Sequence, residues 1–566
     1  MDQLNEFQRL IADEWEFRVK FDPMFATLSG DKRFNDQLPH VAPSDWERHR
    51  QTLQGFRQRL TDIERANLPV AEQLNFDIFS LLLEDAILED DYGTYYLPIA
   101  KTAGFHLDFP ELFQFVPLNT VKDYENYVAR LEAFSRFVQD NITLMREGVQ
   151  KGYRPTQVSL EGIDTALASQ IVESPQASPL FQPFTHFPTG FSLDDQDRLI
   201  EDGGTAIMSS VVAGFRALRR FVEEEYLPAS RIEVSASALP GGLAFYNHRI
   251  RMFTSLDLTA EAVHATGQAE VARIREEMSA LIVKTGFDGD LKAFIAFLRT
   301  DPRFYVHSGE ALMAHAALIL KRMDGELPRL FKTLPRMPYG IRAIPEHSAP
   351  GNTTAYYFPP AGDGTRSGTY YVNLYDLSSR PLYEYEALSL HEAVPGHHLQ
   401  IALQQELGEL PNFRRFGGFT AFVEGWALYA ERLGLEVGFY QDLYSDFGRL
   451  SYEMWRACRL VVDTGLHAMG WTRQQAIDFM AANTSLTLLN IANEVDRYIF
   501  WPGQALAYKI GELKIRELRA RAERRLGSEF NIREFHDLVL GSGAVPLNIL
   551  DKMVEDWINK SHSKRE

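Results

Sequence analysis

The chain has 566 residues, of which 45% are hydrophobic and 24% are charged. This composition is typical of a folded globular protein and excludes a largely disordered chain. The formal net charge of −19 disfavours nucleic acids and anionic membranes as partners, because both carry negative charge. No apolar run reaches the roughly 18 residues that a membrane span requires, so we expect neither nucleic acid nor membrane as a partner.

The first 18 residues mix acidic and apolar side chains in an amphipathic pattern. A secretory signal peptide has a basic start followed by an apolar stretch, which differs from this pattern. We therefore expect a cytoplasmic protein. The single cysteine, Cys458, excludes an internal disulfide framework and a cysteine-rich metal site, and we expect it to pack in the core.

Most of the chain carries apolar residues at the three- and four-residue spacing of amphipathic helices. The clearest predicted helices cover residues 45–60, 70–88, 121–148 and 194–227. Proline-rich interruptions lie at residues 174–188, 227–240 and 334–360, where the chain is expected to form loops. We expect one helical unit with two approximate lobes, an N-terminal lobe at residues 1–230 and a catalytic lobe at residues 231–566.

Strand character is confined to short segments. Residues 368–374 read G-T-Y-Y-V-N-L and are dense in β-branched and aromatic side chains, whereas residues 231–236 and 243–253 are weaker strand candidates. A helix is predicted to begin near Leu382 and to continue into the motif described next. The strand at 368–374 is expected to lie at the edge of a small sheet beside this helix, where it pairs with an extended peptide, and Tyr371 is assigned to substrate binding.

Residues 391–398 read H-E-A-V-P-G-H-H. In the common H-E-x-x-H motif two histidines one helical turn apart bind zinc, and the glutamate accepts a proton from water that the metal activates. Here Pro395 occupies the position of the second histidine, and the next histidines are His397 and His398. On a continuous helix His398 would lie roughly 10 Å from His391 along the axis, too far to share a metal ion.

The Pro395-Gly396 pair offers a solution. Proline cannot donate the helical hydrogen bond to the carbonyl group of residue 391, and glycine tolerates unusual backbone dihedral angles. We therefore predict a bulge or break in the helix that returns a later histidine to the metal. We favour His397 as the second ligand. His398 is the alternative, and is otherwise expected to support the ligands from beside them.

An acidic helix is predicted at residues 420–433, about two dozen residues after the motif. Glu424 and Glu431 lie seven positions apart on it and therefore share a face. We assign Glu424 as the third metal ligand and Glu431 as the hydrogen-bond partner that fixes the tautomer of a histidine ligand. Gly425 leaves room for another helix to approach closely.

These motifs resemble the bacterial domain-of-unknown-function family 885, which carries the signature H-E-A-x-P-G-H-H-L-Q, present here at residues 391–400. Further matching segments are G-T-Y-Y-V-N-L-Y at 368–375, V-E-G-W-A-L-Y-A-E at 423–431 and R-Y-I-F-W-P-G-Q-A-L-A-Y-K-I-G at 497–511. That family is similar to the gluzincin peptidases. The resemblance implies a mainly α-helical, two-lobed protein with a deep central cleft and a zinc ion at its floor, although the histidine spacing departs from the gluzincin pattern by two residues.

Three residues near the C-terminal end complete the predicted site. Tyr508 is assigned to the stabilisation of the oxyanion, since a tyrosine hydroxyl often has this role. Arg497 and Tyr498 are assigned to substrate binding, with Arg497 contacting a substrate carboxylate. The alternatives are core packing for the two tyrosines and an ion pair of Arg497 with Asp496 or Glu494.

The sequence thus predicts a zinc metallopeptidase, an oligopeptidase or dipeptidase-like enzyme, in which metal-activated water attacks short peptides with Glu392 as the general base. Two alternatives stay open. One is a zinc amidase or esterase acting on a non-peptide metabolite, and the other is a catalytically inactive binding protein of the same fold. The sequence does not predict the oligomeric state.

Overall fold

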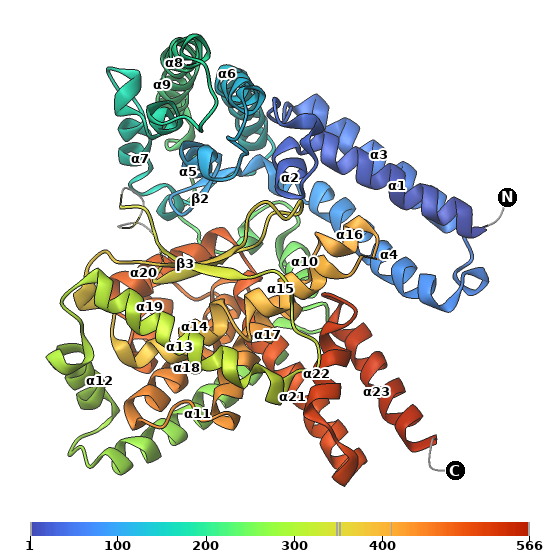
Figure 1. Cartoon of the computed structure of the whole chain (residues 1–566), viewed down its shortest axis with the longest axis vertical. Coiled ribbons are helices and arrows are strands. Elements are labelled where there is room, and N and C mark those ends of the chain that lie inside the picture. The colour runs from blue at the N-terminus through green and yellow to red at the C-terminus, as the bar shows by residue number, and fades with distance from the viewer. Residues whose placement is uncertain (1–2, 347–348, 350–352, 409, 564–566) are drawn as a thin grey trace. The chain divides into compact units, whose positions relative to one another are not determined.

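The computed structural model describes residues 3–346, 349, 353–408 and 410–563. Helices form most of these residues, as the sequence predicts, and small sheets form a minor part (Figure 1). The chain divides into two compact units, Met1–Phe245 and Tyr246–Glu566. The lobe boundary expected at residue 230 precedes this division, and the central cleft stays a prediction.

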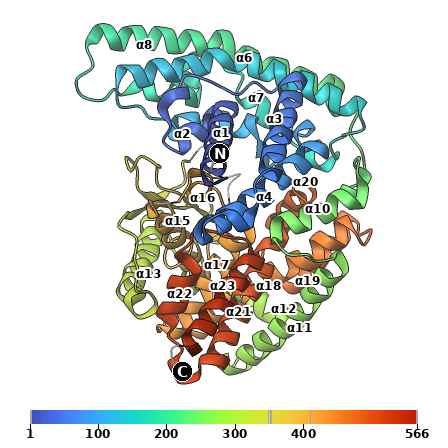
Figure 2. The same cartoon turned by 90° about the vertical axis from the view of Figure 1, so that its right-hand side faces the viewer.

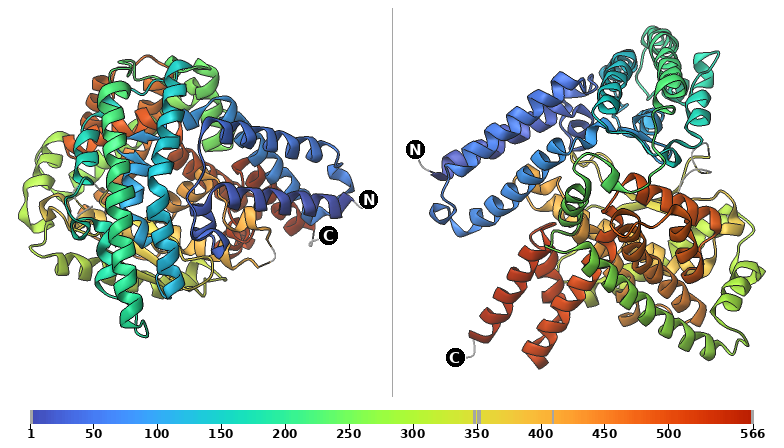
Figure 3. Two further views of the ribbon diagram at one scale, coloured as in Figure 1. Left: turned by 90° about the horizontal axis from the view of Figure 1, so that it is seen from above. Right: turned by 180° about the vertical axis from the view of Figure 1, so that it is seen from behind.

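The first unit is built from long helices and contains a two-stranded sheet of β1 (Ile99–Ala100) and β2 (Ala103–Gly104). Its longest helix, α6, lies beside α8, as Figures 2 and 3 show. The bounds of its helices are α1 Gln3–Phe21, α2 Pro23–Leu28, α3 Pro43–Thr61, α4 Val70–Asp91, α5 Phe105–Asp108, α6 Val121–Gln150, α7 Ile163–Ser169, α8 Leu193–Ala206 and α9 Val212–Phe221.

The core of this unit combines aliphatic and aromatic side chains. Phe134 of α6 stacks on Phe109 with ring centroids 4.0 Å apart and packs against Phe215 of α9. Gly214 allows this contact, because a Cβ atom there would lie 2.9 Å from the ring of Phe134. The helix predicted over residues 194–227 is interrupted by π-helical turns at Ile207–Val211 and Val222–Tyr226.

Two weak strand predictions are wrong. Residues 243–253 lie in helix α10 (Gly242–Thr254), since the run F-Y-N-H-R-I-R-M-F fits helical as well as strand periodicity. Residues 231–236 form no strand, and Arg231 makes only an isolated bridge to Thr156. The helix predictions at 45–60, 70–88 and 121–148 are confirmed.

The second unit contains the motif region and is also mainly helical (Figure 2). None of the described helices is long and apolar enough to cross a membrane. The bounds of its helices are α11 Ala260–Thr285, α12 Leu291–Thr300, α13 Gly309–Leu330, α14 Tyr385–Glu392, α15 His397–Glu406, α16 Asn412–Arg415, α17 Thr420–Leu433, α18 Leu443–His467, α19 Arg473–Asn483, α20 Leu488–Phe500, α21 Ala507–Leu526, α22 Ile532–Leu540 and α23 Leu547–Ser563.

A three-stranded sheet lies beside the motif helices. Its strands are β3 (Tyr339–Ala343), β4 (Ala355–Phe358) and β5 (Gly368–Val372), in the order β3-β5-β4. β5 pairs in parallel with β3 and antiparallel with β4. The strand predicted at 368–374 is therefore present, but it is central, and its expected position at the sheet edge is wrong. Among the described strands, β3 and β4 form the edges.

Two glycines set the contact between α17 and α21. A Cβ atom on Gly425 would lie 2.4 Å from Cα of Gly511, and a Cβ atom on Gly511 would lie 1.9 Å from the carbonyl oxygen of Ala421. The two backbones therefore touch, as the sequence predicts for Gly425. This contact brings the residues one turn before Gly511, including Tyr508, next to the acidic face of α17.

Candidate metal centre

The helix break predicted at the Pro-Gly pair is confirmed. α14 ends at Glu392 and α15 begins at His397, and the Val394–Pro395 peptide bond is cis. Between the helices, the amide of His398 donates to the carbonyl of Ala393 at 3.0 Å. The chain thus turns sharply within four residues, so that imidazoles on both sides of the turn face the same point.

Gly396 and Trp426 hold this turn. A Cβ atom on Gly396 would lie 1.9 Å from the carbonyl oxygen of His391, so no other residue type fits without a shift of the backbone. The indole Nε1 of Trp426 on α17 donates to the carbonyl of Pro395 at 2.8 Å. The same helix therefore fixes the turn and carries the two predicted glutamates.

The structure brings together His391, His397 and Glu424. The Oε2 atom of Glu424 lies 3.6 Å from Nε2 of His391 and 3.5 Å from Nε2 of His397. One ligand atom from each residue lies within 4.8 Å of the others. The imidazole rings stand at 88° to each other with centroids 4.8 Å apart, so their nitrogen atoms converge from different directions.

These residues fit a zinc ion. Tetrahedral zinc with bond lengths of about 2.0–2.2 Å places its ligand atoms about 3.3–3.6 Å apart, which the two measured separations match. The buried Oε2 of Glu424 has no hydrogen-bond partner among the described residues. Such an orphaned carboxylate oxygen is costly, and a cation between the two imidazoles would satisfy it.

The electrostatics of the cluster favour a positive charge. Burial by itself lowers the pKa of His391, but the nearby carboxylates of Glu424 and Glu431 outweigh burial and raise it to about 9. Burial raises the pKa of the Glu424 carboxyl, but the two imidazoles bring it well below its usual range. The carboxylates thus create a field in which a cation is more stable than in an apolar core.

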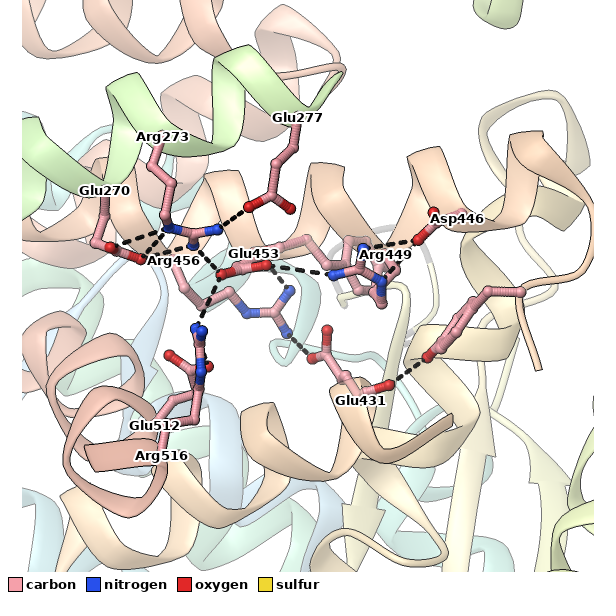
Figure 4. Close-up of polar contacts among 12 residues, drawn as sticks. Glu270, Arg273, Glu277, Glu431, Asp446, Arg449, Glu453, Arg456, Glu512 and Arg516 are labelled. Carbon is pink, nitrogen blue, oxygen red and sulfur yellow. Dashed lines mark hydrogen bonds and ion pairs between the residues drawn. The ribbon is translucent and has the colours of Figure 1, made fainter. Parts of the chain in front are cut away.

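Glu431 holds the ring of His391 from behind. Its Oε1 lies 2.8 Å from Nδ1 of His391, which leaves Nε2 to face His397 and Glu424. Arg456 of α18 places Nη2 3.4 Å from the same carboxylate, and Tyr440 donates to the backbone carbonyl of Glu431 at 2.7 Å. Figure 4 shows Glu431 at the end of a buried network of charged side chains.

Beyond Glu431, this network of charged side chains continues around Glu453 (Figure 4). Lys509 is fully buried, with Nζ 2.8 Å from Glu453, 2.9 Å from Glu512 and 3.0 Å from Glu270. Its charge balances carboxylates from three helices, α18, α21 and α11. The network therefore ties together the helices that carry Glu431, Arg456 and Tyr508.

Glu392, the predicted general base, directly follows His391 and is half-buried. Burial raises the pKa of its carboxyl, while the charges of His391 and His397 act in the opposite direction. A carboxylate with a raised pKa, next to a cation site, is suited to accept and return a proton near neutral pH. Its position beside the three clustered residues agrees with the predicted role.

His398 does not join the cluster. Its Nε2 lies 3.0 Å from the carbonyl of Met337, and its Nδ1 lies 2.8 Å from the hydroxyl of Tyr357. Burial lowers the pKa of His398 to about 4, so the ring is neutral, donating to Met337 and accepting from Tyr357. Both nitrogens are occupied, which favours His397 over His398 as a ligand.

The sheet presents Tyr357 rather than Tyr371 to the motif. Tyr370 of β5 faces α14, where its hydroxyl lies 3.5 Å from that of Ser389. Because side chains alternate along a strand, Tyr371 points to the opposite face, and its ring stacks on Tyr356 at 4.9 Å. Tyr371 therefore lies on the face of the sheet away from α14, and its contact with substrate stays a prediction. No role was predicted for Tyr357 of β4. Its ring lies near that of His397, with the two ring centroids 6.5 Å apart.

Tyr508 lies beside the cluster, as the predicted role requires. Its ring is nearly parallel to that of His391, with a 6.5 Å centroid distance and a 15° interplanar angle. The guanidinium of Arg459 on α18 lies over the ring of Tyr508, with Cζ 4.3 Å from the ring centroid. The hydroxyl of Tyr508 lies 3.4 Å from Nη2 of Arg497.

Arg497 and Tyr498 differ in exposure. The side chain of Arg497 is 27% exposed, whereas Tyr498 is buried and its hydroxyl bonds with Glu494, Arg459 and Trp455. The hydroxyl of Tyr498 is thus engaged inside the protein, as the core-packing alternative expects, and its contact with substrate stays a prediction. Arg497 stays a candidate for substrate binding.

The whole chain has close structural counterparts. A family described as bacterial protein of unknown function (DUF885) matches residues 23–554. A crystal structure described as the putative lipoprotein from Colwellia psychrerythraea is 29% identical and has a TM-score of 0.93, covering 98% of this chain and 100% of that chain. A structure described as a putative lipoprotein of unknown function from Shewanella oneidensis is 17% identical and has a TM-score of 0.71. The match covers 97% of this chain and 99% of that chain. No curated protein matches this chain.

Proposed function

The chain belongs to the bacterial DUF885 family of unknown function, and from its own site we propose that it is a zinc-dependent peptidase that hydrolyses short peptides. One observation carries the proposal. A buried carboxylate oxygen of Glu424 has no hydrogen-bond partner among the described residues and faces Nε2 atoms of His391 and His397 at 3.6 and 3.5 Å. The adjacent Glu392 supplies the base that hydrolysis requires.

Each residue of the site has a separate role in hydrolysis. His391, His397 and Glu424 would hold the zinc ion, which supplies a Lewis acid that activates water and polarises a carbonyl group. Glu392 accepts a proton from the attacking water and delivers it to the nitrogen of the leaving amine as the C–N bond breaks. The hydroxyl of Tyr508 donates a hydrogen bond to the oxygen on which negative charge develops.

The sheet favours a peptide as the substrate. β4 is an edge strand among the described residues, packs against α14 and carries Tyr357 near His397. An extended peptide that pairs with such an edge would place its backbone along the motif helices. β4 therefore takes the role that was predicted for β5.

The test is digestion of a peptide library, read by mass spectrometry, with added zinc and with a chelator. We expect cleavage that the chelator abolishes and that zinc restores. Glu392→Gln is expected to lose about 10²- to 10⁴-fold in rate and to keep its zinc. Glu436→Gln, at an exposed position after α17, is the matched control and is expected to retain activity.

Three outcomes would contradict the proposal. Full activity of Glu392→Gln would remove the general base. Hydrolysis of small amides or esters without any peptide cleavage would favour the amidase or esterase alternative. Protein that binds no zinc and cleaves nothing would be a binding protein of the same fold. The cytoplasmic location stays a prediction, which cell fractionation tests.

A further inference from the structure

Two arginines, Arg459 and Arg497, form ion pairs with the carboxylate of Glu494, at 3.0 and 3.6 Å. Nη2 of Arg459 lies 3.0 Å from Oε2 of Glu494, and the hydroxyl of Tyr498 donates to the same oxygen at 2.8 Å. Nη1 of Arg497 lies 3.6 Å from this oxygen, too far for a hydrogen bond. Glu494 is thus bound by Arg459 and Tyr498, and this group of two guanidinium ions and one carboxylate has an excess positive charge.

The two arginines are not equivalent. Arg459 is 3% exposed, and its guanidinium lies over the rings of Trp455 and Tyr508, at 4.5 and 4.3 Å from their centroids. It is therefore held in place inside the protein. Arg497 is 27% exposed, so it is the member of the pair that a ligand can reach.

Arg497 also contacts the tyrosine that lies beside the candidate metal centre. Its Nη2 donates to Oε1 of Gln504 at 2.8 Å and lies 3.4 Å from the hydroxyl of Tyr508. The ring of Tyr508 in turn lies parallel to His391. Arg497 and His391 are therefore both neighbours of Tyr508, Arg497 at its hydroxyl and His391 at its ring.

We propose that Arg497 binds the C-terminal carboxylate of the substrate, so that the enzyme cleaves peptides close to their free carboxyl end. This inference rests on the proposed peptidase function and narrows its substrate class. A guanidinium forms two parallel hydrogen bonds with a carboxylate. Glu494 makes its hydrogen bonds with Arg459 and Tyr498 and only a longer ion pair with Arg497. A peptide ending in an amide would lack the matching charge.

The experiment compares peptides of identical sequence that end in a carboxylate or in an amide. Charged hydrogen bonds of this kind change kcat/KM by about 10- to 100-fold, so we expect the wild-type enzyme to prefer the free acid by that factor. Arg497→Gln is expected to lower kcat/KM for the acid about 10- to 100-fold more than for the amide, so that the preference disappears. Arg497→Lys keeps the positive charge but lacks the two parallel N–H donors of the guanidinium. Its preference for the acid is expected to lie between those of the wild type and Arg497→Gln.

The control is Arg524→Gln, which removes the same charge from an exposed position of α21 and is expected to keep the preference. Equal cleavage of acid and amide by the wild type, or an equal loss of both in Arg497→Gln, would overturn the inference while leaving the peptidase function in place.

A binding measurement separates this inference from the peptidase function. Zinc-loaded Glu392→Gln is titrated calorimetrically with the acid and amide forms of one peptide. Tighter binding of the acid that disappears in the Glu392→Gln/Arg497→Gln double variant supports the carboxylate site, even if the wild type proves inactive. Absence of any difference between the two peptides would overturn it.

Discussion

The Nδ1 atom of His391 lies 2.8 Å from Oε1 of Glu431, a residue forty positions further along the chain. This bond orients the imidazole so that Nε2 faces His397 and Glu424. A metal-binding histidine usually has such a partner on its other nitrogen, and the partner raises the basicity of the ligand. The helix that provides Glu431 also provides Glu424, so α17 both completes the cluster and fixes its first histidine.

We expect Glu431→Gln to weaken zinc binding by about 10- to 100-fold. The amide of glutamine can still accept a hydrogen bond from His391, but it carries no charge to stabilise the ligand. Competition with a chromophoric chelator measures this affinity. An unchanged affinity would show that Glu431 has no part in the metal centre.

Arg456→Met tests the charge behind Glu431. Arg456 lies 3.4 Å from the Glu431 carboxylate, and both side chains are buried. Loss of one partner leaves an uncompensated buried charge, which destabilises a protein by about 3–5 kcal/mol. We expect a lower free energy of unfolding in urea together with weaker zinc binding. Reduced stability with intact zinc affinity would restrict Arg456 to a structural role.

The contact between α17 and α21 is tested by Gly425→Ala. The added methyl group would lie 2.4 Å from Cα of Gly511, so the helices must separate, at a cost of about 1–3 kcal/mol. Tyr508 would move relative to Glu424, and we expect activity to fall in the folded protein. The control is Gly325→Ala in α13, where a Cβ atom meets nothing within 4 Å, and a gain of about 0.5–1 kcal/mol is expected. Equal effects of both substitutions on the melting temperature would contradict this account.

Lys509→Met removes the cation that balances Glu453, Glu512 and Glu270 in the buried network. We expect a loss of about 3–5 kcal/mol at neutral pH, measured by urea denaturation. Lys514→Met, which removes two more exposed ion pairs, with Glu517 and Asp551, is expected to cost less than about 1 kcal/mol per pair.

The effect of Lys509→Met is expected to depend on pH. Burial raises the pKa of Glu453, but Lys509 and Arg273 outweigh burial and lower it below its usual value of 4.5. A depressed folded-state pKa contributes stability above the unfolded-state value, and this contribution is lost as the pH falls. The stability difference between wild type and variant should therefore be full above about pH 5 and shrink on acidification. A difference that grows below pH 5 would contradict the assigned charges.

The sequence predicts the local features of the site well. The break at Pro395-Gly396 follows from the missing amide proton and the missing side chain, which are properties of these two residues alone. The shared face of Glu424 and Glu431 follows from helical periodicity. The choice between His397 and His398 could not be made in this way, because it depends on the direction of the turn and on Met337 and Tyr357, which lie far away in the sequence.

The features that could not be predicted depend on neighbours that no local pattern specifies. Tyr371 belongs to a real strand, but β4 covers its expected free edge, and the pairing decides which face each tyrosine occupies. The short segment A-Y-Y-F at 355–358 was the available signal for β4 and for Tyr357. Tyr498 is similar, since its burial is decided by Arg459 and Glu494.

The zinc content of matched histidine variants tests the central claim most directly. Wild-type protein, His397→Gln and His398→Gln are dialysed against a limiting zinc buffer and analysed for metal per chain. We predict about one zinc ion per chain in the wild type and in His398→Gln, and a loss of zinc in His397→Gln. Retention of zinc in His397→Gln with loss in His398→Gln, or a wild-type protein that binds none, would contradict the account.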